Sequence, residues 1–408
     1  MKIAMVSEHA SPLATVGGAD AGGQNVHVAA LSRALAERGH DVTVYTRREC
    51  PFQSAEVAFA PGVTVVHVPA GPAVTLPKDD LLAWMPDFGR WLARRWDAAP
   101  PDVAHSHFWM SGLASLAAAR DTAVPIVHTF HALGAVKRRH QGRADTSPRE
   151  RVGAEALVAR QADAVIATCA DEVAELVRMR TPERAVRVIP CGVDLAAFTP
   201  DGPAADLGPR DSGPVLLAIG RAVPRKGVET TIRALRHVPD ATLVVAGGSP
   251  GEPEPARLVR IARMYGVADR VRFIGRVARE DVPALMRAAD AVVSVPWYEP
   301  FGIVPLEAMA CGTPVVASAV GGHLDTVVPG VTGLLVPPRD SAALGQALRE
   351  LLADPARLRA YGAAAAARAR SGYGWDEVAD RTAAVYAEVL ASQGPRTAAG
   401  AFRGTGAA

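Results

Sequence analysis

Short apolar runs alternate with amphipathic stretches through the first half of the chain. The run Lys2–Ser7 has the character of a strand, and a glycine-rich loop and a helix from about Gln24 to Arg38 follow it. Another strand-like run begins at Asp41, and this order of strand, loop, helix and strand is how a doubly wound parallel sheet begins. Further strand-like runs are Val63–Val68, Val103–His105, Ile126–Phe130, Ala164–Thr168 and Val186–Ile189. The pattern therefore predicts an α/β fold with a Rossmann-like sheet.

The alternation stops at Thr199–Pro214 and then starts again. These sixteen residues hold four prolines, three glycines and three aspartates, which is typical of a segment that joins two domains. Strand-like runs resume at Val215–Ile219, Thr242–Ala246, Val271–Ile274 and Ala291–Val295. We therefore expect two Rossmann-like domains, residues 1–198 and 215–374, joined by a linker at 199–214. A last amphipathic helix is expected at 375–391, and residues 393–408 are expected to be disordered.

Composition narrows the class of protein. A chain of 408 residues exceeds one ordinary core and fits two domains of about 200 residues each. The formal net charge of +2 gives no reason to expect nucleic acid as a partner, and Cys50, Cys169, Cys191 and Cys311 are too scattered to predict a zinc site. The N-terminus lacks the apolar core of a signal peptide, and no run of about 18 apolar residues occurs. We expect a cytoplasmic protein without a membrane segment or metal site, with a homodimer as an open alternative.

The stretch Trp297–Ser318 carries the clearest chemistry. Glu299 lies in a loop punctuated by proline and glycine, and Glu307 follows eight residues later. Pro305 is expected to be the first residue of a short helix, which places Glu307 in the first turn and turns the N–H groups of residues 302–306 towards a ligand. A helix start of this kind favours phosphate, while acids suit hydroxyl groups. A single acid there would be an ordinary capping residue, but the combination predicts a nucleotide sugar as the ligand.

The full pattern, E-P-F-G-I-V-P-L-E-A-M-A-C-G-T-P-V-V, closely resembles the signature of the retaining glycosyltransferases that include sucrose synthase, the glycogen synthases and the mycothiol glycosyltransferase. The resemblance covers nearly all of residues 1–392 and is closest to the mycothiol branch. It implies the GT-B fold, in which two Rossmann-like domains face each other across a cleft and the final helix crosses back onto the first domain. It also implies a nucleoside diphosphate sugar as co-substrate, expected to be a UDP-sugar, and no further cofactor.

The resemblance also implies roles for residues that bind the donor. Glu307 is expected to hold the ribose hydroxyls and Glu299 those of the transferred sugar, while Val277 is expected to lie beside the base. The remaining expected donor contacts are Phe301, Gly302, Ile303 and Val304.

Arg221 and Lys226 stand in G-R-A-V-P-R-K-G, directly after the first strand of the second half. Two cations five residues apart in a loop that leads to a helix can clamp a diphosphate, because guanidinium grips two oxygens and ammonium acts as a point charge. Surface cations at strand ends are also common, but the family places its leaving-group clamp in a matching pattern. Arg225 and the basic run Lys137–His140 are expected to be solvated.

Gly22 and Gly23 end the first loop and open the first helix. Glycine lets the backbone approach a phosphate closely, and the helix start adds partial positive charge. The resemblance places a D-x-G-G-x-x-x-x-V segment, here residues 20–28, over the donor diphosphate. His9 and Asn25 would then lie near the acceptor and the sugar.

His131 follows a predicted strand in H-T-F-H-A. A lone histidine is more often structural, but its place at a strand end and the family's H-T-x-H pattern predict a contact with a hydroxyl of the donor sugar. His105 and His107 end another strand and are expected on opposite faces of it, which argues against a shared metal. We interpret both as residues of the core edge or the acceptor side.

Lys78 and Arg151 fall where the mycothiol branch uses cations to hold the acceptor phosphate. That branch has hydroxyl donors where this chain carries Phe108 and Ala132, so two hydrogen bonds to phosphate would be missing. Glu155 lies four residues after Arg151 and could pair with it along a helix.

The combined prediction is a retaining, metal-independent glycosyltransferase. Arg221, Lys226, Glu299 and His131 are the expected catalytic residues, and His9, Asn25, Lys78, Phe108 and Arg151 the expected acceptor contacts. The sequence favours a small polar acceptor such as a cyclitol, an aminocyclitol or a sugar. Transfer of N-acetylglucosamine to inositol phosphate is the alternative, and a GT-B epimerase and a non-catalytic nucleotide-sugar sensor are weaker ones.

Overall fold

The computed structural model describes residues 1–14, 22–208, 213–249 and 251–393. Within these residues, the first half of the chain forms an eight-stranded sheet of order β3-β4-β2-β1-β5-β6-β7-β8. Its strands are β1 Lys2–Val6, β2 Asp41–Arg47, β3 Glu56–Ala60, β4 Val63–Val68, β5 Val103–His107, β6 Ile126–Thr129, β7 Ala164–Ala167 and β8 Val186–Val188. All of the pairings are parallel except that of β3 with β4. The expected doubly wound sheet is therefore present.

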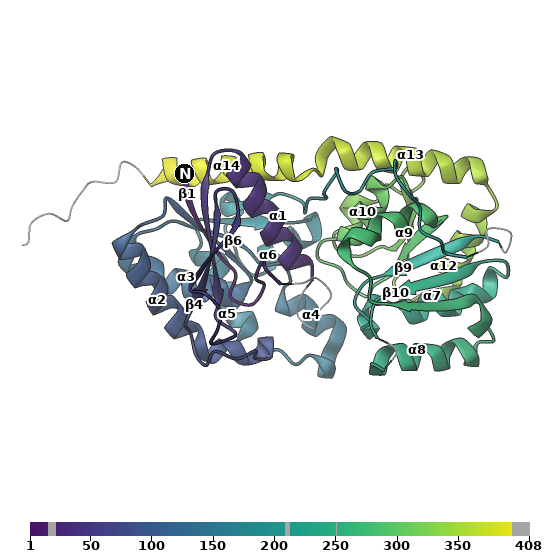
Figure 1. Ribbon diagram of the computed structural model, residues 1–408, viewed down its shortest axis with the longest axis horizontal. Coiled ribbons are helices and arrows are strands. Elements are labelled where there is room, and N and C mark those ends of the chain that lie inside the picture. Colours follow the sequence, from purple (N-terminus) through teal and green to yellow (C-terminus); the bar gives the residue numbers. More distant parts are fainter. Residues whose placement is uncertain (15–21, 209–212, 250, 394–408) are drawn as a thin grey trace, which may run out of the picture.

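A second sheet, from the later half of the chain, has six strands in the part that the structure describes, in the order β11-β10-β9-β12-β13-β14. Its strands are β9 Val215–Ile219, β10 Thr242–Ala246, β11 Val271–Gly275, β12 Ala291–Ser294, β13 Val315–Ser318 and β14 Gly333–Val336. Every pairing in it is parallel. Figure 1 shows the two sheets, each with its helices, side by side.

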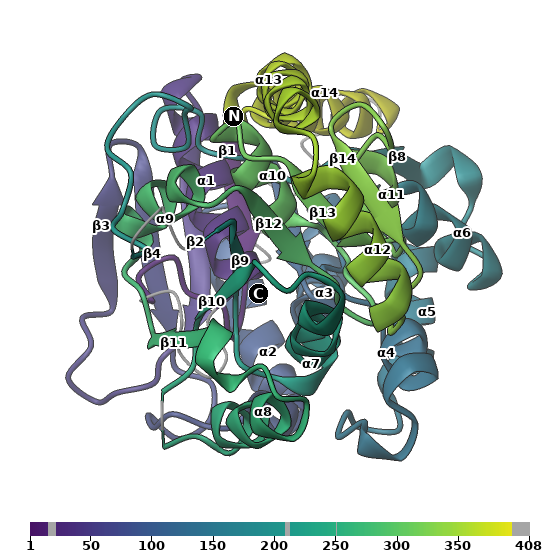
Figure 2. The same cartoon turned by 90° about the vertical axis from the view of Figure 1, so that its right-hand side faces the viewer.

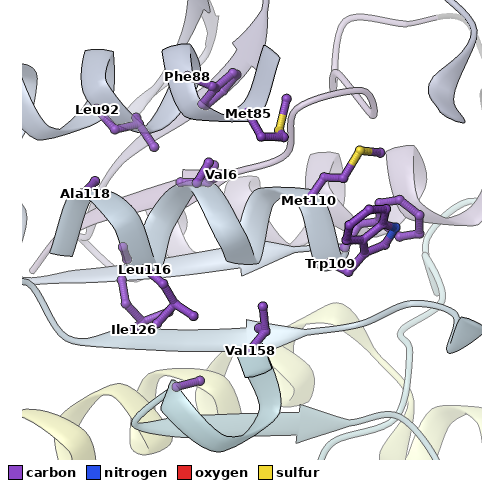
Figure 3. Close-up of a cluster of buried hydrophobic side chains, with 14 of the residues drawn as sticks. Val6, Met85, Phe88, Leu92, Trp109, Met110, Leu116, Ala118, Ile126 and Val158 are labelled. Atoms are coloured by element: carbon purple, nitrogen blue, oxygen red, sulfur yellow. The ribbon is translucent and has the colours of Figure 1, made fainter. Parts of the chain in front are cut away.

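Helices cover both faces of each sheet. The first half contains α1 Gly23–Glu37, α2 Met85–Ala98, α3 Trp109–Thr122, α4 Gly134–Gln141, α5 Arg151–Gln161 and α6 Ala170–Arg178. The second contains α7 Val228–Ala234, α8 Pro253–Met264, α9 Val282–Ala288, α10 Ile303–Ala310, α11 His323–Thr326, α12 Ser341–Leu352 and α13 Pro355–Gly372. Figure 3 shows α2 and α3 packing Phe88, Leu92 and Met110 against Val6 of β1, one of two buried clusters that flank the first sheet.

The last helix, α14 (Trp375–Ser392), returns to the first sheet. Val378, Val385 and Tyr386 are buried in the same cluster as Ile3 of β1, and α14 packs on α1. In Figure 1, α13 lies along the second half and α14 along the first, and Figure 2 shows the two helices nearly end-on. The last helix thus ties the two halves together.

The described part of the segment 199–214 lies against the second half of the chain. Arg287 donates to the carbonyl oxygens of Thr199, at 3.0 Å, and Pro203, at 2.9 Å. Leu207 is buried in the core of the second sheet. This segment is therefore anchored at several points, which its proline-rich composition does not reveal.

The C-terminal tail and the absence of a membrane segment were also predicted from the sequence. Of the tail expected to be disordered, residues 394–408 lie outside the described residues. Among the helices that the structure describes, none is long and apolar enough to cross a membrane.

Candidate active site

A cavity of about 670 Å³ lies between the two halves, at the carboxyl ends of strands of both sheets. The predicted site residues that line it are His9, Gly22, Gly23, Asn25, Lys78, Phe108, His131, Arg151, Arg221, Lys226, Val277, Phe301, Ile303, Val304, Glu299 and Glu307. Gly302 lies between two lining residues as the N-cap of α10. The fold thus brings the predicted residues together around one space that both halves enclose.

Lys226 and Glu299 form an ion pair in the wall of this cavity, with 2.5 Å between Nζ and Oε2. Lys226 follows β9 and Glu299 follows β12, and these two strands are neighbours in the sheet. Burial alone would raise the pKa of Glu299, but Lys226 and Arg225 hold it at about 2. Burial lowers the pKa of Lys226, and Glu299 opposes that effect. Lys226 is therefore held in place by a carboxylate that stays ionised at neutral pH.

Arg221 also lines the cavity, in the loop after β9. Gly227, next to Lys226, has a φ of +73°, and a Cβ there would come within 1.9 Å of the carbonyl oxygen of Val295. Only glycine can therefore end this loop so close to the neighbouring strand. Arg225, which was expected to be solvated, is partly exposed, lines the cavity and has its guanidinium 5.3 Å from the ring centre of Tyr298.

Helix α10 begins two residues earlier than expected. Gly302, with a φ of +76°, is the N-cap and Ile303 the first helical residue, so Pro305 is the third and Glu307 lies beyond the first turn. The N–H of Leu306 donates to the carbonyl oxygen of Gly302 at 3.2 Å. The expected row of N–H groups at residues 302–306 therefore shrinks to residues 302–304, since proline has none.

Glu307 is 2% exposed and forms an ion pair with Arg279. Burial raises the pKa of Glu307, and Arg279 acts against that rise. Both residues border the cavity, and so does Arg276, which stands one residue before Val277. Sequence analysis missed Arg276 and Arg279, although they flank the position expected to lie beside the base.

At the start of α1, the N–H of Gly22 donates to Oδ1 of Asn25 at 2.9 Å, and Nδ2 of Asn25 donates to the carbonyl oxygen of Ser11 at 3.0 Å. Asn25 therefore links the start of α1 to Ser11 besides lining the cavity. A Cβ on Gly23 would lie 3.1 Å from Cδ1 of Ile303, so the two halves approach each other closely here. Asp20, the first residue of the predicted motif, lies outside the described residues.

The predicted acceptor residues gather around the ring of Phe108. Nζ of Lys78 lies 5.4 Å and Cζ of Arg151 5.0 Å from the centre of this ring, and the ring of His9 meets it edge-on at 4.9 Å. Arg151 is 2% exposed and Nε donates to Glu155 at 2.7 Å, so the proposed helical pair is present. The arginine's orientation is thus fixed before any ligand binds.

Two polar residues of this end were not selected from the sequence. Lys137 lines the cavity and pairs with Asp145 at 2.9 Å, although the basic run was expected to be solvated. Thr146 also lines the cavity and donates to Asp79, which in turn pairs with Lys78. Together with Arg151, Lys78 and Lys137 make this end of the cavity cationic.

The prediction that His105 and His107 point to opposite faces was wrong, because residues two apart in a strand share a face. Their ring centres are 4.2 Å apart. His131 follows β6 with a φ of +62°, and its Nε2 lies 2.8 Å from Nδ1 of His107. Burial places the pKa of both of these histidines well below the usual value, so both rings are neutral at physiological pH.

The wall of the cavity is strongly cationic overall. Among the described residues it carries eight lysine and arginine side chains against three carboxylates. Such a wall attracts a ligand with several negative charges. Diphosphate at one end and a second anion at the other would satisfy this distribution.

Comparisons with known proteins agree with this geometry. Residues 204–368 match the family described as glycosyl transferases group 1, and residues 21–197 match Glycosyltransferase Family 4. The chain is 41% identical to the D-inositol 3-phosphate glycosyltransferase of Xylanimonas cellulosilytica over 95% of this chain and 96% of the relative. It is 40% identical to the protein of the same name from Kribbella flavida, over 94% of this chain and 95% of the relative.

Among solved structures, the sucrose-phosphate synthase of Thermosynechococcus elongatus matches with a TM-score of 0.88 and 35% identity, covering 96% of this chain and all of that one. Anabaena HepE in complex with UDP and glucose matches with a TM-score of 0.72 at 20% identity, over 95% of this chain and 99% of that one. The second likeness shows the shared fold.

Proposed function

The chain belongs to the group 1 glycosyltransferases of the GT-B fold, and on that basis we propose that it transfers a sugar from a nucleoside diphosphate sugar to a hydroxyl group of a phosphorylated cyclitol. The single observation that carries the choice of acceptor is the cationic end of the cavity, where Lys78 and Arg151 flank Phe108. The names of the relatives, which specify D-inositol 3-phosphate, support it. This inference departs from the preference for an unphosphorylated acceptor that the sequence favours.

The second end of the cavity suits the donor. Arg221, Lys226 and the N–H groups at the start of α10 would stabilise the negative charge that develops on the departing diphosphate. Glu299 would accept hydrogen bonds from hydroxyls of the sugar while it holds Lys226. Glu307, fixed by Arg279, would bind the ribose of a nucleotide for which we propose UDP.

The proposed reaction retains the anomeric configuration. The bond between the anomeric carbon and the diphosphate oxygen breaks, and the acceptor oxygen bonds to the same carbon from the same face. The proton of the acceptor hydroxyl passes to an oxygen of the leaving phosphate, so no additional base is required. Positive charges fixed in the protein stabilise the negative charge that develops on the leaving diphosphate.

A specific observation keeps an unphosphorylated acceptor as the second candidate. The three cations at the acceptor end each have a carboxylate partner: Asp79 for Lys78, Asp145 for Lys137 and Glu155 for Arg151. These pairs reduce the net charge available to a phosphate. Phe108 and Ala132 also bring no side-chain hydrogen-bond donor to this end.

The test offers the purified protein a panel of nucleoside diphosphate sugars with D-inositol 3-phosphate, inositol and 2-deoxystreptamine together, and identifies products by mass spectrometry. We expect the phosphorylated cyclitol to be glycosylated in preference. Lys78→Ala should raise the KM for this acceptor by roughly tenfold or more, the effect of one charged contact, without changing slow donor hydrolysis. Lys2→Ala, which alters an exposed lysine outside the cavity wall, is the control. Preferential glycosylation of inositol or 2-deoxystreptamine would replace the proposal with the second candidate.

A further inference from the structure

The side chains of His107 and His131 meet inside the first domain, just behind the cavity. In the register of β5 and β6, His107 lies opposite Thr129, so the chain that leaves β6 brings His131 beside it. Nδ1 of His107 is 2.8 Å from Nε2 of His131. His131 lines the cavity, whereas His107 is fully buried and is not part of the lining. His107 can therefore act on a ligand only through its neighbour.

A hydrogen bond between two neutral imidazoles determines where their protons are. Each neutral ring carries one N–H, and the bond needs an N–H on one side and a lone pair on the other. If His107 donates, the proton of His131 is on Nδ1; if His131 donates, Nδ1 of His131 is an acceptor. The tautomers of the two rings are therefore coupled.

Among the described residues, the contact with His107 is the hydrogen bond that holds the ring of His131. Within the described residues, Nδ1 of His131 and Nε2 of His107 are both buried without a hydrogen-bond partner. The other neighbours of the His131 ring are aromatic, with His27 at 5.0 Å and Phe301 at 5.1 Å between ring centres. Packing against these rings restricts tilt but does not select a tautomer.

His107 is itself held firmly. Its ring lies 4.2 Å from that of His105, which is hydrogen-bonded to Tyr386 of α14 at 2.7 Å and to Thr129 at 2.9 Å. His131, in contrast, has a left-handed backbone conformation, with a φ of +62°. A non-glycine residue in this region is strained, and such strain persists where the surrounding structure imposes it. The surrounding structure therefore holds the ring of His131 in one orientation.

We propose that His107 is a positioning residue for sugar transfer: its bond to Nε2 holds the ring of His131 and selects which tautomer His131 presents to a hydroxyl of the donor sugar. The proposal rests on the proposed function and on the contact between His131 and a sugar hydroxyl that the sequence predicts. His107 itself touches no substrate. The buried, unpartnered Nδ1 of His131 is the atom whose donor or acceptor character His107 would select.

The kinetics of two His107 variants test this role first. His107→Phe keeps a ring of similar shape but removes the hydrogen bond, and His107→Asn returns an amide near the position of Nδ1. We expect His107→Phe to lower kcat for nucleotide release from the sugar donor by on the order of 10- to 100-fold, the scale of a slightly misplaced group. In His107→Phe, the fold-change in KM for the donor should be smaller than the fold-change in kcat. His107→Asn should recover most of the activity.

The double variant separates positioning from an independent effect. If His107 acts through His131, then adding His107→Phe to His131→Phe lowers kcat no further, because coupled groups are not additive. His67→Phe is the matched control, since His67 is also buried and bonds through Nδ1, to the carbonyl oxygen of Ser54 at 2.6 Å, but does not line the cavity. Multiplied losses in the double variant, or a kcat for His107→Phe within about threefold of wild type, would overturn the proposal.

A spectroscopic test does not depend on turnover. In protein labelled with ¹⁵N-histidine, two-bond nitrogen–proton spectra report the tautomer of each ring. We expect His131 to show one neutral tautomer in the wild type, and the opposite tautomer or a mixture in His107→Phe. An unchanged His131 pattern in the variant would refute the positioning role even if the enzyme is active. Absence of turnover with every donor, together with the expected change of tautomer, would refute the proposed function and leave the coupling of the two rings established.

Discussion

At the scale of single residues, the site is built from charges that are already paired before a substrate arrives. Lys226 bonds to Glu299 and Arg151 to Glu155, and in each pair the carboxylate fixes the direction of a cation that borders the cavity. Fixed cations need no reorganisation when negative charge develops, which is the basis of electrostatic catalysis. Removing one partner of either pair leaves a charge behind that is fully buried in the Arg151–Glu155 pair and partly buried in the Lys226–Glu299 pair.

This reasoning predicts two separable effects of Lys226. Lys226→Met should lower kcat by roughly 10²- to 10³-fold, the scale of one lost donor to a developing anion. It should also lower the unfolding midpoint, because Glu299, whose side chain is only 12% exposed, then loses its partner. Steady-state kinetics and thermal unfolding measure the two effects.

The control for this prediction is the double variant Lys226→Met with Glu299→Gln. It should regain stability, since the carboxylate without a partner is gone, but not activity. If Lys226→Met alone keeps kcat within about threefold of wild type, then Lys226 does not neutralise the leaving group.

At the scale of elements, the crossing of α14 depends on contact between two distant segments. Gly192 precedes Val193, which bridges to Gly374, and a Cβ on Gly192 would lie 2.5 Å from Cδ2 of Trp375. The ring of Trp375 also meets that of His27, at 5.2 Å between centres. At position 192 there is therefore no space beside Trp375 for a residue larger than glycine.

We expect Gly192→Ala to destabilise the fold by about 1–3 kcal/mol, the usual effect of overpacking. Gly153→Ala is the matched control: Gly153 is an exposed residue of α5, and a Cβ there has no neighbour within 4 Å. That change should be neutral or stabilise the helix by up to about 1 kcal/mol. Denaturant midpoints measure both, and equal midpoints for the two variants would contradict the close contact at Trp375.

The elements also show what the sequence could and could not predict. Hydrophobic runs located most strands, because buried parallel strands are continuously apolar. They missed two edge strands: β3, whose residues are partly buried or exposed, and β14, where Leu334 and Leu335 are only partly buried. Pro305 suggested the wrong helix start because proline is tolerated anywhere in the first turn, and the left-handed Gly302 determined the start instead.

The site residues that could be predicted from the sequence were those with a local sequence pattern. Residues next to recognisable motifs, such as Arg221 and Glu299, were predicted and lie in the cavity wall. Arg279 and Thr146 were missed because their role depends on which distant residues the fold brings near, namely Glu307 and Asp79. Pairings over such sequence separations leave no local pattern.

At the scale of the whole molecule, the excess of cations in the cavity wall predicts how the enzyme responds to chelators. Among the described residues, eight cationic side chains line the cavity, and five of them lie outside the acceptor end, on the side where the diphosphate would bind. We therefore expect turnover of a nucleotide sugar to survive an excess of EDTA. Loss of turnover on chelation, with recovery on adding Mg²⁺ or Mn²⁺, would show that a divalent cation neutralises the diphosphate.

The interior of the first domain also predicts how stability depends on pH. Burial lowers the pKa of His27 to about 4 and that of His128 to about 3, from an ordinary value of 6.5. At pH values between the lowered pKa of each histidine and 6.5, the unfolded chain binds protons that the folded chain does not. Stability from these groups is therefore complete above about pH 7 and is lost as the pH falls towards 4. For His27 alone, the loss amounts to roughly 3 kcal/mol.

Buried carboxyls act in the opposite sense. Burial raises the pKa of Glu155, Glu172 and Glu307, so each favours the folded state at low pH and loses that contribution as the pH rises through its folded pKa. The two groups therefore oppose each other over the pH range in which both titrate. Stability falls on acidification only where the summed effect of the histidines exceeds that of the carboxyls.

We expect the histidines to dominate between pH 7 and 5, because His105, His107 and His131 also have a pKa that burial lowers. The unfolding midpoint should therefore fall over this range, with net proton uptake on unfolding measurable by calorimetry in buffers of different ionisation enthalpy. Replacing His27 and His128 together with Asn should flatten the pH dependence even if it lowers stability overall. Replacing the exposed His237 with Asn should leave the slope unchanged. If the double variant keeps the wild-type slope, other groups cause the acid sensitivity, and these two buried histidines do not take up protons on unfolding.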